Sequence, residues 1–103
     1  MRADAAVERH DGPPPGEDEI AARMRAEGLS PYGWGNGPGD TYGWHEHGYE
    51  KVLYCVEGSI RFELENEGRT LELEAGDRMV LPPGTVHSAV VGNHGCTCIE
   101  GRR

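Results

Sequence analysis

Apolar and charged residues alternate strictly along two stretches in the second half of the chain, residues 60–65 and 69–74. Such alternation is typical of β-strands with one buried face, because successive side chains point to opposite sides of a sheet. Residues 66–68, Asn-Glu-Gly, predict a hairpin turn between the two strands. The glutamates of these strands then form an outer acidic face, which is more often a solvated surface than a binding site: Glu63, Glu65, Glu72 and Glu74.

Further strands are predicted on both sides of this hairpin. The apolar run over residues 51–57 predicts a buried strand that ends in a turn at Gly58, and residues 96–100 form the last strand after a turn at residues 92–95. In all, we expect about seven or eight short strands with turn signals about every 8–12 residues. This pattern predicts an all-β fold, an antiparallel barrel or jelly roll.

The first part of the chain has a different pattern. Residues 1–16 are polar and contain three consecutive prolines, so we expect a flexible N-terminal tail. Residues 17–28 predict a short helix with Ile20 and Met24 on one face, which packs on the outside of the barrel. Gly28 followed by Leu29 is typical of a helix C-cap. Residues 17–103 then form a single domain, with the barrel over about 30–100.

Composition excludes several classes of partner. The formal net charge is −8, which argues against nucleic acid and against an anionic membrane surface. The sequence has no run of about 18 apolar residues and no signal peptide, and its three cysteines are an odd number, so we predict reduced thiols and a cytoplasmic location. A hydrophobic content of 36% permits a core that a second copy of the chain would extend, so we expect a homodimer.

Histidines are placed where they can meet. His45 and His47 are two residues apart, so on a strand both imidazoles point the same way. His87 follows a Pro-Gly turn and starts a returning strand. If that strand lies beside the first, the three imidazoles converge on one metal ion. Such ligands suit Zn, Fe, Ni, Cu and, less well, Mn, exclude Ca and Mg, and leave an open position for water or substrate.

These two stretches resemble the two motifs of the cupin family, small β-barrel proteins that often hold a metal inside the barrel. The family's first motif is His-x-His, three residues, Glu, six residues and Gly, and its second is Gly, five residues, Pro-x-Gly, two residues and His. The matching positions, within roughly residues 40–100, are His45, His47, Gly58, Gly76, Pro82, Gly84 and His87. The resemblance implies a double-stranded β-helix barrel and a homodimer. The family includes oxygenases, isomerases, decarboxylases and plain binding proteins.

One position departs from the family pattern. Lys51 stands where the first motif has its Glu, and the trailing Asn of the second motif is replaced by Val91. Strand alternation predicts that Lys51 faces inward and Glu50 outward, unless a bulge re-aims Glu50 as a fourth metal ligand. An inward Lys51 can act as a neutral base, attract an anionic substrate as an ammonium, or extend its charge to the barrel mouth.

Aromatic and sulfur side chains are open to two interpretations each. Six of the seven aromatic residues lie between Tyr32 and Tyr54. They can form the wall of a pocket or part of the core, and we favour the core for Trp34. Cys55 should face inward, deeper than Lys51. Cys96 and Cys98 share one face of the last strand, and we favour packing over a soft-metal site.

Three functions fit these patterns. The first is a metal-dependent enzyme, such as a dioxygenase-type oxidoreductase or an isomerase, that acts on a small anionic molecule with Lys51 as a catalytic residue. The second is a non-catalytic sensor or binding protein for a small molecule. The third is a metal-free cupin in which Lys51 replaces the charge of the ion. Fold alone does not decide among them.

Overall fold

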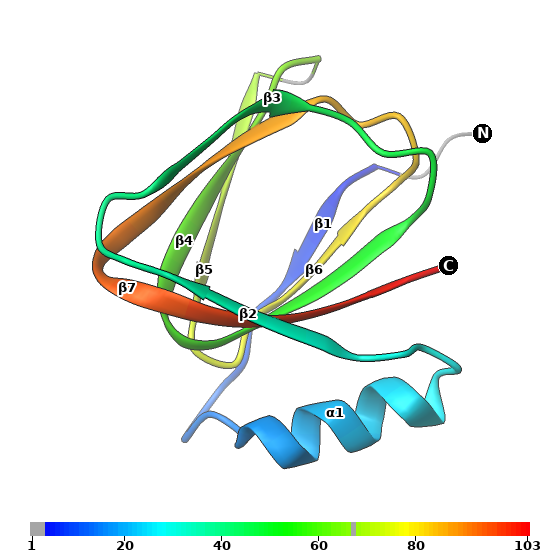
Figure 1. The fold of residues 1–103 in the computed structure, drawn as a ribbon. Coiled ribbons are helices and arrows are strands. Elements are labelled where there is room, and N and C mark those ends of the chain that lie inside the picture. The colour runs from blue at the N-terminus through cyan, green and yellow to red at the C-terminus, as the bar shows by residue number, and fades with distance from the viewer. Residues whose placement is uncertain (1–3, 67) are drawn as a thin grey trace.

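The computed structural model describes residues 4–66 and 68–103. Within this part, one helix and one seven-stranded antiparallel sheet form a barrel, which confirms the predicted all-β fold with a short helix (Figure 1). The elements in chain order are β1 (Ala6–Glu8), α1 (Glu17–Ala26), β2 (Tyr32–Asn36), β3 (Thr41–His45), β4 (Lys51–Leu64), β5 (Arg69–Glu74), β6 (Arg78–Leu81) and β7 (His87–Arg102).

The two longest strands organise the barrel. β4 and β7 pair with each other over most of their length. The first part of β4 also pairs with β6 and its second part with β5, while β7 pairs first with β3 and then with β2. Each long strand therefore contributes to both ends of the barrel, and the inward faces of both meet in one core.

The change of partner occurs at a glycine corner. Gly58 has φ +72°, and a Cβ added there would lie 2.0 Å from the carbonyl oxygen of Gly95. On β7, residues 92–95 face the single residue Ser59, since Gly58 pairs with Cys96 and Ile60 with Val91. The sequence predictions of a strand end at Gly58 and a turn at 92–95 are therefore wrong. Pairing between β4 and β7 resumes on either side, so both segments are irregular parts of continuous strands, where the strands bend.

Helix α1 covers the outer face of the sheet, as predicted (Figure 1). Ile20 and Met24 are fully buried against outward-facing residues of β4 and β7, including Val52 and Ile99. The helix ends in a Schellman motif, in which the Gly28 and Leu29 N–H groups donate to Arg25 and Met24 carbonyls. This arrangement confirms the predicted cap, with the last helical residue at Ala26. The helix is ten residues long, and no helix in the described part is long and apolar enough to cross a membrane.

The segment expected to be a flexible tail at residues 1–16 is docked on the barrel over part of its length. β1 pairs with β6, and Ala5 is 2% exposed. The buried carboxylate of Asp77 accepts hydrogen bonds from the Arg9 guanidinium and the His10 N–H, each at 2.9 Å. The sequence prediction failed here because a short strand and a carboxylate 67 residues away, rather than an apolar run, anchor the segment.

Two further predictions concern the surface. Of the predicted acidic face, Glu65, Glu72 and Glu74 are exposed and Glu63 is half-buried; His94 is exposed as well. The predicted hairpin turn at 66–68 includes Glu67, which lies outside the described residues, and the flanking strands β4 and β5 pair as expected.

Candidate metal centre

Three histidines come together at one end of the barrel. β3 ends at His45, whose Cα pairs directly with that of His87, the first residue of β7. His47 follows in the loop after β3, and the Gly84 N–H donates to the His47 carbonyl at 2.8 Å, which links this loop to the Pro-Gly turn before β7. The strand carrying His87 thus lies beside that carrying His45, which is the arrangement that the sequence required.

The three imidazoles are close enough to share one ion. Ring centroids are 4.2 Å apart for His45 and His87, 4.9 Å for His45 and His47, and 5.3 Å for His47 and His87. One ligand nitrogen from each residue lies within 4.8 Å of the others. His87 is 1% exposed, and the other two are half-buried.

Backbone carbonyls fix the protonation of two of these rings. The Nδ1 atom of His45 lies 2.6 Å from the Gly43 carbonyl oxygen, and that of His87 lies 2.8 Å from the Thr85 carbonyl oxygen. A carbonyl oxygen only accepts, so each Nδ1 carries the proton and each Nε2 presents a lone pair. A ring in this tautomer can bind a metal ion through Nε2.

The facing nitrogens lack partners in the protein. The Nε2 atoms of His47 and His87 are buried without a hydrogen bond in the described structure. A buried polar atom without a partner is costly, and a metal ion would satisfy both atoms at once. The residues present therefore fit a transition metal ion.

Burial and neighbouring charges favour the neutral form of two of these rings, those of His87 and His47. Burial lowers the pKa of His87 to about 4, against the opposing hydrogen bond to Thr85, and the neighbouring His45 and Lys51 lower it further. Burial, followed by the charge of Lys51, also holds the pKa of His47 below its ordinary value. Neutral imidazole is the form that binds metal ions, so the pair is prepared for an ion at neutral pH.

The family assignment follows from this geometry and from sequence comparison. A protein-family model described as a cupin domain matches residues 36–99, more than half of the chain. The chain is a cupin.

Solved structures agree with this cupin fold. An RmlC-like cupin from Shewanella frigidimarina NCIMB 400 has 28% identity and a TM-score of 0.62, over 72% of this chain and 64% of that one. A chain from crystal structures of the DMSP lyases RdDddP and RnDddQII has 31% identity and a TM-score of 0.66, over 73% of this chain and 38% of that one. The polyketide cyclase RemF from Streptomyces resistomycificus has 26% identity and a TM-score of 0.64, over 72% and 54%.

The cupin described here spans less than two thirds of each of these three proteins. No curated protein matches the chain significantly.

This cupin carries a buried ion pair where the family motif has a carboxylate ligand. Lys51 faces inward as predicted and is 8% exposed, and its Nζ lies 3.6 Å from Oε1 of Glu100. The Nε1–H of Trp34 donates to the same oxygen at 2.8 Å. Sequence reasoning missed Glu100. A signal existed, because Glu100 shares the strand parity of Cys98, which we had placed on one face with Cys96.

Glu50 lies away from the histidines. Its carboxylate is 3.5 Å from Nε of Arg103, and its backbone forms two hydrogen bonds with that residue. Within the described residues, the cluster of candidate ligands consists of the three histidines and includes no carboxylate.

A cavity of about 270 Å³ adjoins the histidines. Its polar end is formed by His45, His87, Lys51 and Glu100, and its walls are aromatic or apolar: Tyr32, Trp34, Tyr42, Phe62 and Ala89. Trp34, which we expected in the core, is half-buried and lines this cavity, whereas Trp44 is 54% exposed. The cavity is therefore amphipathic, with its charged groups next to the candidate metal centre.

The cysteines lie in the core. All three are free thiols with exposures between 0% and 6%, and Cys55 pairs with Cys98 across the β4–β7 ladder. The packing role that we favoured is confirmed.

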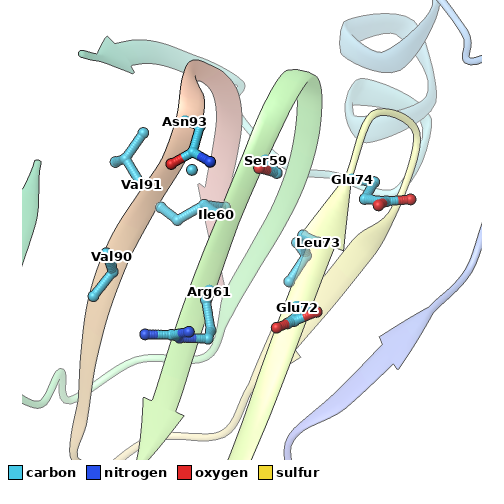
Figure 2. Close-up of a pocket in the computed structure, with 10 residues that line it drawn as sticks. Ser59, Ile60, Arg61, Glu72, Leu73, Glu74, Val90, Val91 and Asn93 are labelled. Atoms are coloured by element: carbon cyan, nitrogen blue, oxygen red, sulfur yellow. The ribbon is translucent and has the colours of Figure 1, made fainter. Parts of the chain in front are cut away.

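A second hollow of about 270 Å³ lies over β4, β5 and β7 (Figure 2). Arg61 and Glu72 sit side by side on neighbouring strands there, and no histidine or cysteine lines it. It is part of the predicted acidic face and offers no comparable set of ligands.

Proposed function

We propose that this cupin is a metal-dependent enzyme that acts on a small anionic molecule. His45, His47 and His87 hold one divalent transition metal ion, drawn from Fe, Ni, Zn, Mn and Cu. The observation that carries the proposal is the pair of buried Nε2 atoms, on His47 and His87, that face the cluster without a hydrogen-bond partner. When bound, the ion supplies a Lewis acid that stabilises negative charge on a substrate oxygen.

Lys51 orients the substrate. Its ammonium lies beside the Glu100 carboxylate, which balances its charge within the barrel. An ammonium has three N–H donors, so donors remain for a carboxylate or enolate oxygen in the cavity. The indole N–H of Trp34 donates to the same Glu100 oxygen and holds that carboxylate beside Lys51.

The cavity walls support the same assignment. Phe62 and Ala89 are buried, and with Trp34 they form an apolar surface next to the charged pair. An apolar wall excludes water and strengthens the interaction of a bound anion with the ammonium. A small molecule with an apolar body and one anionic group matches both ends of the cavity.

The named relatives favour lyase-type or cyclase-type chemistry over oxidation. Two structures with at least 26% identity are named as DMSP lyases and a polyketide cyclase. We therefore propose lyase-type or cyclase-type chemistry, in which protons move at a carbon near the anionic group, ahead of the dioxygenase-type oxidation that the family resemblance first suggested. In either case the substrate binds between the histidines and Lys51.

Metal content tests the proposal. The purified protein, a His47→Ala variant and a His94→Ala variant are analysed by elemental mass spectrometry, with exposed His94 as the matched control. We expect about one transition metal ion per chain in the wild type and in His94→Ala, and at least about a tenfold loss in His47→Ala. A wild-type protein that is empty and also refuses added Fe, Ni, Mn, Cu and Zn would contradict the proposal.

A further inference from the structure

His47 differs from the other two histidines in what orients its ring. His45 and His87 each donate Nδ1–H to a backbone carbonyl, but within the described residues neither ring nitrogen of His47 forms a hydrogen bond. A ligand imidazole usually gains its orientation from a partner outside the metal centre. Among the described residues, the contacts that orient this ring are therefore packing contacts.

The ring of Tyr49 lies against His47. The two ring centroids are 4.8 Å apart and the ring planes differ by 27°, which is a stacked arrangement. The Tyr49 ring is covered in turn by Arg102, whose guanidinium carbon lies 4.5 Å from the ring centroid. A guanidinium at this distance is attracted to the aromatic face and also packs against it.

The backbone around these side chains is tied down at two points. The His47 carbonyl accepts the Gly84 N–H at 2.8 Å, and Glu50 exchanges two backbone hydrogen bonds with Arg103, at 2.9 and 3.0 Å. These bonds place the loop between β3 and β4 beside the end of β7. These backbone bonds do not restrict rotation of the His47 side chain. The stack with Tyr49 does restrict it.

We propose that Tyr49 and Arg102 are positioning residues that hold the His47 imidazole in its metal-binding orientation. The inference rests on the proposed function, since it assigns a role in ion binding. Tyr49 and Arg102 belong neither to the cluster of candidate ligands nor to the lining of the cavity, so their proposed action is through His47. The geometry also explains why Arg102, exposed and opposite Lys51 in the ladder, packs on an aromatic ring.

Zinc affinity tests the role of Tyr49. The dissociation constant is measured by competition with a chromogenic chelator for wild type, Tyr49→Phe and Tyr49→Leu. Phenylalanine keeps the stacked ring, so we expect an affinity within about twofold of wild type. Leucine removes the ring, and we expect binding to weaken by about 10-fold or more. Equal affinity for Tyr49→Leu and wild type would overturn the inference.

Arg102→Lys extends the test at an exposed position, where the fold is retained. Lysine preserves the positive charge near His47 but loses the planar contact with Tyr49. We expect a loss of zinc affinity of about threefold to tenfold. An unchanged dissociation constant would overturn the part assigned to Arg102.

A readout without metal separates this inference from the proposed function. In the metal-free protein, the ring current of Tyr49 should shift the His47 ring-proton NMR signals upfield, with His47→Ala to assign them. The shift should persist in Tyr49→Phe and disappear in Tyr49→Leu. Unchanged signals in Tyr49→Leu would overturn the positioning role. A wild-type protein that refuses Fe, Ni, Mn, Cu and Zn would contradict the proposed function instead, while the metal-free NMR signals still decide the positioning role.

Discussion

Lys51 and Glu100 form an ion pair in the barrel interior, with Nζ 3.6 Å from Oε1 and side-chain exposures of 10% and 12%. Neither charge has much access to water, so each depends on the other. Removal of one partner leaves a buried charge, whereas removal of both leaves a neutral site.

This dependence predicts non-additive stabilities. Glu100→Gln should lower the free energy of unfolding by about 3 kcal/mol, because the Lys51 ammonium loses its counter-charge. The double variant Lys51→Met/Glu100→Gln should recover at least about 1 kcal/mol of that loss. Urea unfolding of both single variants and the double variant measures the coupling. Purely additive changes would show that the two charges do not interact.

Binding of an anion should depend on Lys51. We expect benzoate to perturb the visible spectrum of the Co(II)-substituted wild type, and to bind at least about tenfold more weakly to Lys51→Met/Glu100→Gln. The double variant carries no unpaired buried charge, so it is a better comparison than Lys51→Met alone. Equal benzoate affinity in both proteins would contradict the role assigned to Lys51.

The low pKa of His87 makes stability depend on pH in the metal-free protein. The folded-state pKa is about 4, below the unfolded value of 6.5, so the unfolded state binds the proton first as pH falls. The neutral His87 ring therefore gives its full contribution to the free energy of unfolding above pH 6.5. That contribution is lost progressively as the pH falls toward 4. Between pH 7.5 and 5 the loss should be about 2 kcal/mol.

Urea unfolding in the presence of a chelator checks the size and sign of this effect. His87→Leu should reduce the pH dependence by most of that amount, because the titrating group is gone. His94→Leu, at an exposed position, should leave it unchanged. Stability of the wild type that rises as pH falls over this range would contradict the prediction.

Gly58 should be the least replaceable glycine at the barrel corner. Gly58→Ala places a Cβ 2.0 Å from the Gly95 carbonyl oxygen, while Gly39, at a similar φ of +74°, has no atom within 4 Å of an added Cβ. Gly39→Ala should cost about 1–2 kcal/mol for the backbone conformation alone. Gly58→Ala should cost at least about 3 kcal/mol more, or yield insoluble protein. Similar melting temperatures for the two variants would contradict this steric argument.

Local patterns predicted the parts of this molecule that depend on local chemistry. Strand alternation placed Lys51 inside the barrel, a Gly-Leu pair marked the end of α1, and two motif spacings identified the three histidines. A homodimer and a cytoplasmic location stay predictions.

What the sequence did not show depends on register between distant strands. Glu100 meets Lys51 because β4 and β7 pair with one particular alignment, and that alignment includes bulges that alternation cannot locate. Tyr49 lies in the loop before β4 and meets Arg102 next to the Lys51–Arg102 pair of the same ladder. β1 was missed because three residues with one half-buried side chain, Val7, carry too little periodicity to stand out in a polar segment.

Lys51, at the start of β4, pairs with Arg102, at the end of β7. During protein synthesis this pair forms only after nearly the whole chain has been made. The two positions are 51 residues apart in the sequence, and a ribosome adds about 5–20 residues per second, so the start of β4 waits about 3–10 s for its partner. Throughout that interval Leu53 and Cys55, which are fully buried in the finished barrel, lack their β7 neighbours. The nascent chain therefore exposes an apolar strand that chaperones can bind before the barrel closes.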